Sequence, residues 1–114
     1  MAKNKGIREK ISSHYLEKIS GKEDTIRVEE WDLDILVKPA NLTSMTKINE
    51  YTEREDNIGA MITMVIECCF AVDGKKMFEE EDREFLMNDA DPDVVIELGT
   101  KVSGLAITMK QAGN

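Results

Sequence analysis

Residues 58–72 form the most apolar segment of this chain, and they constrain its fold more than any other feature. Apolar side chains occur at almost every position, and Glu67 is the one charged residue among them. On a helix these side chains would surround the axis, which is typical of a helix buried on most sides. At about fifteen residues, the segment is too short to span a bilayer. We therefore predict that residues 58–72 form the central core helix, which ends at the stop signal Asp73-Gly74.

Other segments show the periods of amphipathic strands and helices. Alternating polar and apolar residues predict two short antiparallel strands over residues 25–28 and 31–37. Helical spacing predicts four further helices: about 6–19, from Thr43 or Ser44 to about 56, a short helix that begins at Glu79 to Asp82 with Phe85 and Leu86 facing inward, and Pro92 to Met109. We expect one α+β domain over residues 1–114, predominantly helical, in which a two-stranded antiparallel hairpin packs with about five helices.

The net charge is acidic, but its distribution is uneven. A formal charge of −8 repels phosphate backbones and anionic lipids, which argues against nucleic-acid and membrane partners. Residues 1–22 carry six basic and two acidic side chains, a net charge of +4, and the remainder carries −12. Within this basic segment Ile7, Ile11, Tyr15 and Ile19 recur every four residues. We predict a basic amphipathic helix that is either a docking arm or a helix with a solvated face.

The cysteines and the histidine do not form a recognisable site. His14 is the only histidine, and it is distant in sequence from Cys68 and Cys69, so no zinc-binding spacing is present. The two cysteines are neighbours in a segment predicted to be helical, where their side chains would diverge by about 100° and could not pair. We expect reduced, buried thiols. No continuous apolar stretch follows the first basic residues, so we expect no signal peptide and a cytoplasmic protein.

Three aspartates invite comparison with a calcium-binding loop. Asp89, Asp91 and Asp93 have the alternating spacing with which such a loop begins, but Val94 and Thr100 occupy the positions that require glycine and a bidentate carboxylate. The glycines of the chain are scattered and form no phosphate loop, and no serine lies in a nucleophile motif. The sequence therefore predicts a protein that is not an enzyme and that has no cofactor or metal.

Several short features follow one another along residues 25–105. They are Ile35-Leu36-Val37-Lys38 at the end of the strand pair, Leu42-Thr43 at a helix entry, the apolar helix before Asp73-Gly74, Phe78 with acidic residues ahead of Leu86, and the closing Val94-Val95, Leu98, Val102 and Ser103-Gly104-Leu105. In this order they resemble the tail assembly chaperones of long-tailed bacteriophages. The basic residues 1–22 depart from the compact pattern of that family.

The resemblance implies a small protein of an infected or lysogenic bacterial host, encoded by a phage or prophage. It implies that the protein acts in the host cytoplasm, binds the long helical tape measure protein and keeps it soluble while tail tube subunits polymerise around it. The tail tube protein is thus a second candidate partner. It also implies absence from the finished tail, and many members of the family are additionally made as a longer, frameshifted form.

The last predicted helix carries an apolar seam suited to docking on another helix. Val95, Leu98, Val102, Leu105 and Met109 recur there at alternating spacings of three and four residues. Methionine adapts to irregular apolar surfaces. We predict that the contacts with the tape measure protein are made by Leu98, Val102, Leu105 and Met109 and, on the central helix, by Met61 and Met64. The same residues also suit the chain's own core.

Two other functions fit the composition. A small acidic regulatory protein could inhibit a nucleic-acid-binding protein or a host enzyme by mimicking phosphate, and its binding would weaken steeply with salt. A structural tail component would instead self-assemble into rings or tubes through a long exposed strand edge, for which the sequence offers no candidate.

Overall fold

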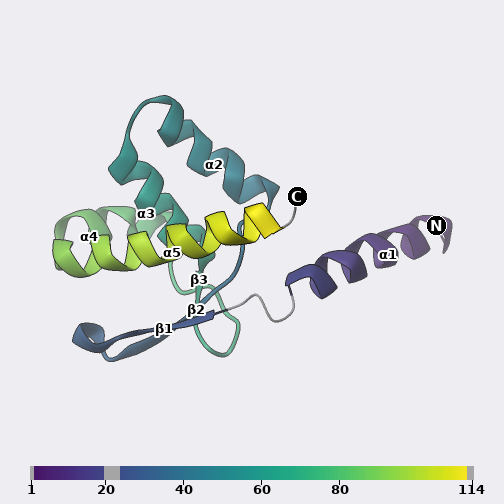
Figure 1. The fold of residues 1–114 in the computed structure, drawn as a ribbon, viewed down its shortest axis with the longest axis horizontal. Helices are drawn as coiled ribbons and strands as arrows, with labels where there is room; N and C mark the ends of the chain where they lie inside the picture. Colours follow the sequence, from purple (N-terminus) through teal and green to yellow (C-terminus); the bar gives the residue numbers. More distant parts are fainter. Residues whose placement is uncertain (1, 20–23, 113–114) are drawn as a thin grey trace.

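The computed structural model describes the backbone of residues 2–19 and 24–112 and the side chains of residues 6–18 and 24–105. Within these residues, five α-helices accompany a small three-stranded sheet (Figure 1). The elements in order are α1 (Ala2–Ile19), β1 (Asp24–Val28), the 3-10 helix η1 (Glu29–Trp31), β2 (Leu33–Val37), α2 (Leu42–Glu53), α3 (Asn57–Cys68), β3 (Cys69–Phe70), the 3-10 helix η2 (Glu80–Asp82), α4 (Arg83–Asn88) and α5 (Pro92–Ala112). The predicted fold class, predominantly helical with a small antiparallel sheet, is confirmed. None of the described helices has the length and hydropathy that crossing a membrane requires.

Strands β1 and β2 form the predicted hairpin. They pair antiparallel with Ile26 opposite Ile35, and both of these side chains are buried. Helix η1 joins the strands, and its turn closes at Asp32, which has a φ of 53° and donates its amide hydrogen to the carbonyl of Glu29 at 3.1 Å. Because η1 includes Trp31, β2 begins two residues later than its alternating pattern predicts.

The prediction of one helix over residues 58–72 was wrong at its C-terminal end. Helix α3 ends at Cys68, and the next two residues form β3, in which Phe70 pairs with Leu36 of β2. The amide of Lys38 also donates to the carbonyl of Cys68 at 3.0 Å. An unbroken apolar run suits a buried strand as well as a buried helix, so its periodicity did not locate the change. The sheet has the order β1-β2-β3 and contains three strands where two were predicted.

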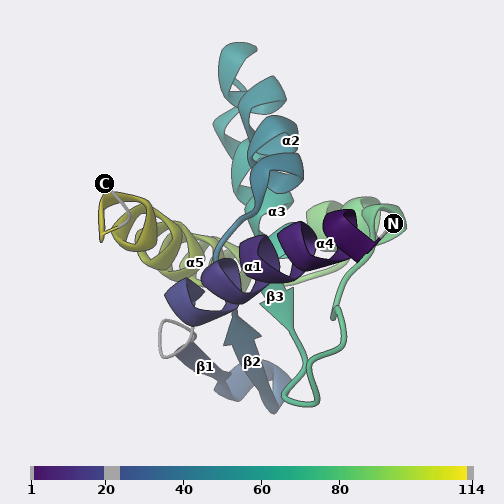
Figure 2. The ribbon, with the colours of Figure 1, turned by 90° about the vertical axis from the view of Figure 1, so that its right-hand side faces the viewer.

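Helices α2 and α3 form a helical hairpin that extends away from the sheet (Figure 2). The side chain of Asn41 caps α2 by accepting the amide hydrogen of Ser44 at 2.9 Å, so neither Thr43 nor Ser44 is the cap. The side chain of Asp56 caps α3 in the same way through the amide of Gly59, also at 2.9 Å. These short polar side chains satisfy amide groups that have no partner within the helix.

The prediction for the inner face of α4 was half right. Leu86 is buried, whereas the side chain of Phe85 is 54% exposed. Successive residues on a helix point about 100° apart, so a short helix that packs on one side buries only one of two neighbours.

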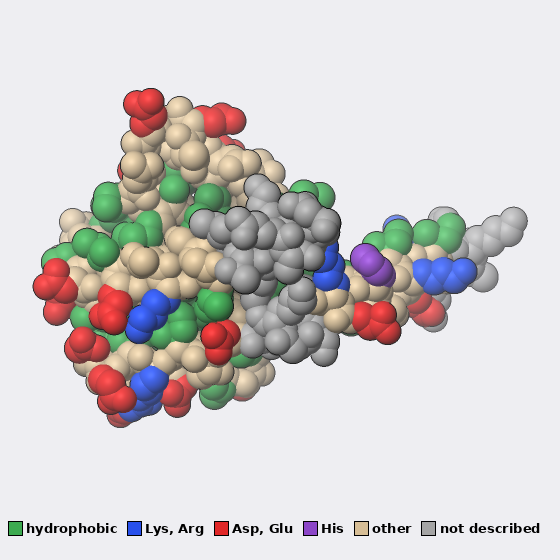
Figure 3. Space-filling view, in the orientation of Figure 1, with side chains coloured by type: hydrophobic (Ala, Val, Ile, Leu, Met, Phe, Trp, Pro, Cys, Tyr) green, Lys and Arg blue, Asp and Glu red, His purple; other side chains and the backbone are tan. Residues whose placement is uncertain are grey.

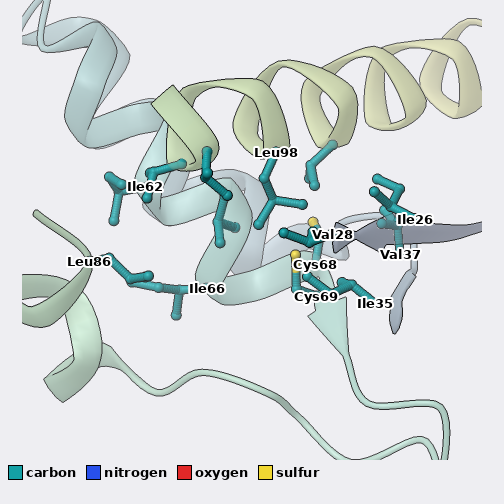
Figure 4. Packing of buried hydrophobic residues seen from close by; sticks show 14 residues of the cluster. Ile26, Val28, Ile35, Val37, Ile62, Ile66, Cys68, Cys69, Leu86 and Leu98 are labelled. Atoms are coloured by element: carbon teal, nitrogen blue, oxygen red, sulfur yellow. The ribbon is translucent and has the colours of Figure 1, made fainter. Parts of the chain in front are cut away.

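The main core lies between the sheet and helices α3 and α5 (Figure 4). Strands β1 and β2 contribute alternate residues to it, and Leu98 points from α5 towards their side chains. The buried residues include Ile26, Val28, Ile35 and Val37 from the strands, Ile62, Val65 and Ile66 from α3, and Val94, Val95, Leu98 and Val102 from α5.

Helix α1 projects from this body at the end opposite α4 (Figure 1). All of its described side chains, residues 6–18, are exposed. The radius of gyration is 15.4 Å, whereas a compact chain of this length has about 13 Å. The predicted basic helix is therefore present, and its apolar stripe is not used to pack the body.

Candidate partner-binding surfaces

The structure places one part of the predicted α5 seam inside the core and another part at the edge of the core. Leu98 and Val102 are buried, and Leu105 is half-buried where it packs against the core. The side chain of Met109 lies outside the described residues. A partner could therefore reach Leu98 or Val102 only if α5 moved, and Leu105 is the described part of the seam nearest to solvent. The role of the seam in binding stays a prediction.

Met61 and Met64 lie where α3 meets α5, so the structure brings the two predicted sets together. A β-carbon placed on Gly99 of α5 would lie 2.5 Å from the sulfur of Met61, which shows how closely the helices approach. The hydroxyl of Ser103 lies 3.0 Å from the sulfur of Met64. Both methionines are half-buried and pack against the core. Flexible thioethers at this contact can adapt if α5 shifts.

Apolar side chains on and beside α4 are exposed, which the sequence did not indicate. Phe85 and Met87 of α4 and Ile96 of α5 are each about half exposed. Between residues 79 and 97, nine carboxylates surround them in sequence, and Arg83 is the only basic residue. Figure 3 shows hydrophobic and acidic side chains intermingled at the end of the molecule where α4 and the start of α5 lie. We call residues 79–97 the acidic end.

A second exposed apolar surface lies on α1. Ile7, Ile11, Tyr15 and Leu16 are all exposed, and the exposure of Ile11 reaches 64%. We call Ile7, Ile11 and Tyr15 the α1 stripe. Exposed apolar side chains that recur along one stripe of a helix can form a contact surface. The spacing of the stripe was visible in the sequence, but its exposure was not.

Glu67, which interrupts the apolar run, joins three parts of the chain. Its side chain is only 9% exposed. It accepts a hydrogen bond from the hydroxyl of Ser44 at 2.8 Å and lies 3.5 Å and 3.4 Å from the ammonium groups of Lys47 and Lys76. Burial by itself would raise the pKa of this carboxyl, but Ser44 and the two lysines outweigh burial and hold the pKa below its ordinary value of 4.5. Glu67 therefore ties α3 to α2 and to the segment after β3.

Replacing Glu67 with glutamine is expected to lower the free energy of unfolding at neutral pH by about 1–2 kcal/mol, because the charged partner of both lysines is lost. Folding lowers the pKa of Glu67, so its stabilising contribution is complete above pH 4.5 and is lost as the pH falls through the lower pKa of the folded state. Urea denaturation of both proteins at neutral and at acidic pH measures this. A difference between them that stayed the same size in acid would contradict the assignment.

The two cysteines are buried and unpaired. Burial, with a smaller effect from the charge of Glu67, raises the pKa of Cys68 to about 11, and burial raises the pKa of Cys69 to about 12. Both thiols are thus protonated at neutral pH, the form that is a poor nucleophile and a poor metal ligand.

A shallow groove between β1 and α5 is lined by Ile26, Val28, Val94 and Leu98, with charged side chains around them. Its volume is about 30 Å³, whereas pockets for organic ligands usually enclose about 300–1,000 Å³. Among the residues with described side chains, no three His, Cys, Asp or Glu residues converge as a metal site would require.

Comparison with known proteins places the fold. No protein-family model matches the sequence, and no curated protein matches it. Among solved structures, the tail assembly chaperone of bacteriophage HK97 has a similar fold, with a TM-score of 0.58 over 76% of this chain and 79% of that chain. The sequence identity is 14%. The two chains thus share a fold while most of their residues differ.

Proposed function

We propose that this protein is a bacteriophage tail assembly chaperone that binds the tape measure protein and keeps it soluble during tail tube assembly. The observation that carries the proposal is the fold shared with the HK97 tail assembly chaperone over more than three quarters of both chains. The ordered features of residues 25–105, which resemble the same family, support it independently.

The physical basis of the proposal is that this protein covers apolar helix faces of its partner reversibly. A tape measure protein is a long helical chain, and its apolar faces would aggregate before the tube surrounds them. In this protein the half-buried Leu105, Met61 and Met64 form an apolar margin along the contact of α3 and α5. We propose that this margin, extended by Leu98, Val102 and Met109 where α5 shifts, takes up a helix of the partner. The net charge of −8 keeps such a complex soluble.

The same proposal specifies where the protein acts and at which stage of assembly it leaves. It acts in the host cytoplasm as a binding protein without catalytic activity, it meets the tail tube protein as the tube displaces it, and it does not remain in the finished tail. A sustained contact with nucleic acid or a membrane is opposed by the carboxylates that dominate the body.

Co-expression with a phage tape measure protein, a long helical protein, tests the proposal. We expect more of the long protein in the soluble fraction and recovery of both proteins together at low and at high salt, because burial of apolar surface is insensitive to salt. Leu105→Ala is expected to weaken capture about tenfold, the loss that a moderately important contact produces.

Val72→Asp is the matched control, because Val72 is exposed and lies in the turn after β3, away from α5. It should leave capture unchanged. Circular dichroism of each variant shows whether weaker capture results from an altered surface or from unfolding. No capture at either salt would overturn the proposal, and capture that disappears at high salt would favour the acidic regulatory protein instead.

A further inference from the structure

We propose that the open edge of β1 binds a basic, extended segment of a partner protein, which adds to the sheet as an antiparallel strand. The backbone of that segment pairs with Thr25 and Arg27, and one small apolar side chain enters the groove between β1 and α5. This site is separate from the apolar margin along α3 and α5, and the inference does not depend on the proposed chaperone role.

The bonds between β2 and β3 fix the direction of the backbone groups in β2. The amide of Lys38 donates to the carbonyl of Cys68 at 3.0 Å, so the backbone of Lys38 faces β3. Backbone groups alternate in direction along an antiparallel strand. Those of Ile35 therefore face β1 and bond to Ile26, which lies opposite in the register.

The backbone groups of Thr25 and Arg27 consequently point away from β2. They face the open side of β1, the edge strand of the sheet (Figure 2). The amide of Thr25 donates to the side chain of its own neighbour Asp24 at 2.9 Å, as an amide that does not face β2 can. Outward N–H and C=O groups of an edge strand are a template for another strand. A carbonyl of an added strand can replace the carboxylate of Asp24.

The groove beside this edge supplies the apolar part of the site. Ile26 and Val28 of β1 and Val94 and Leu98 of α5 line it, and none of the described residues of β2 or β3 does, so it opens beside β1. Paired residues of neighbouring strands direct their side chains to the same face, so a residue opposite Ile26 points into the groove. Its volume of about 30 Å³ suits one small side chain, because a single water molecule needs about 10–15 Å³.

The charges around the edge specify a basic partner. Residues 24–34 carry five carboxylates and one basic side chain, a net charge of −4. The basic side chain, Arg27, already forms ion pairs with three of those carboxylates. The other two belong to Asp24, the first residue of β1, and to Glu30, which lines the groove beyond the last. Lys101 on α5 is paired within its own helix. A segment with a basic residue at each end complements this edge.

The peptide acetyl-Lys-Thr-Val-Thr-Lys-amide is the probe. It places valine opposite Ile26 and a lysine near each of Asp24 and Glu30. We expect nuclear magnetic resonance of the isotopically labelled full chain to show the amide signals of Thr25 and Arg27 shifting as peptide is added. In the free protein the outward amide of Arg27 should exchange its hydrogen faster than that of Ile26, and saturating peptide should slow this exchange at least about tenfold.

Methylation of the peptide backbone tests the direction of the hydrogen bonds. In antiparallel pairing the two threonines lie opposite Thr25 and Arg27 and exchange backbone bonds with them, whereas the amide of the valine points away from β1. Methylating both threonine amides is expected to weaken binding at least about tenfold. Methylating the valine amide is the matched control and should change binding by less than about twofold.

Variants of the protein test the same edge. Thr25→Pro removes an outward amide hydrogen and obstructs an added strand, while the bonds between Ile26 and β2 stay in place. It should abolish binding, and Thr25→Val, which keeps the amide, should not. Glu30→Lys should also weaken binding, and a peptide whose first lysine is replaced by glutamate should bind this variant better, because an antiparallel strand begins near Glu30. Circular dichroism shows whether each variant is folded.

A peptide that shifted neither edge amide would overturn the inference. So would binding that survives methylation of the threonine amides, or that Thr25→Pro and Thr25→Val weaken equally in folded protein. An Arg27 amide that exchanged as slowly as that of Ile26 in dilute free protein would contradict the open edge. Protection of Arg27 that rose with protein concentration alone would assign the edge to a second copy of the chain and would equally refute the proposed partner.

Discussion

Leu98→Asp is expected to leave no folded protein. Leu98 is 2% exposed and packs among the strands and α3 in the centre of the core. Burying an unpaired carboxylate there costs several kcal/mol beyond the lost packing, which is comparable with the whole stability of about 5–15 kcal/mol of a typical domain. The milder Leu98→Ala is expected to lower the free energy of unfolding by about 3 kcal/mol. Urea denaturation followed by circular dichroism measures the alanine variant, and the aspartate variant should lack the cooperative transition.

The matched control lies two residues earlier on the same helix. Ile96 is 48% exposed, so Ile96→Asp should change the free energy of unfolding by less than about 0.5 kcal/mol. Equal effects at the two positions would show that α5 does not pack with the face described. The pair also bears on function, because loss of binding by Leu98→Asp would report the lost fold and not a lost contact.

Arg83→Met is expected to lower the free energy of unfolding by about 2 kcal/mol, because a charge-assisted hydrogen bond and a stacking contact are lost together. Nη2 of Arg83 donates to the buried hydroxyl of Thr63 at 2.8 Å and to Glu80 at 3.0 Å. The guanidinium also lies 4.6 Å from the ring centre of Tyr51. One side chain thereby joins α4 and η2 to both helices of the α2–α3 hairpin. Methionine keeps an unbranched apolar stem but removes the guanidinium and with it every one of these donors.

Arg54→Met measures the contribution of stacking on Tyr51 without the hydrogen bond that Arg83 makes to Thr63. The guanidinium of Arg54 lies 4.5 Å from the same Tyr51 ring, but Arg54 is exposed and its only side-chain hydrogen bond shown in the structure is to the carbonyl of Glu50, at 3.2 Å. We expect a loss below about 1 kcal/mol for this variant. Thermal and urea denaturation compare the two variants. If Arg54→Met were as destabilising as Arg83→Met, the link to Thr63 would not be what matters.

The sequence predicted the elements whose pattern is local. Alternation of Ile26 and Val28 with polar residues located β1, and Asp91-Pro92 located the start of α5, because side-chain period and backbone caps depend on neighbours along the chain. The same reasoning failed at Cys69, where an apolar run continues unchanged from helix into strand. The polar residue within that run, Glu67, was a visible signal, but its partners Ser44 and Lys76 lie too far along the chain for spacing to identify them.

By itself, then, the sequence determined the main helices and the β1–β2 hairpin, the basic character of α1 and the acidic character of the body. Only the tertiary structure decided which apolar side chains are covered. Leu98 and Ile96 belong to one helix, yet the sheet and α3 bury the first and leave the second in solvent. Strand β3 likewise exists because β2 presents unpaired backbone groups beside it. Burial and pairing depend on elements distant in the chain, and those distances are set only when the elements pack.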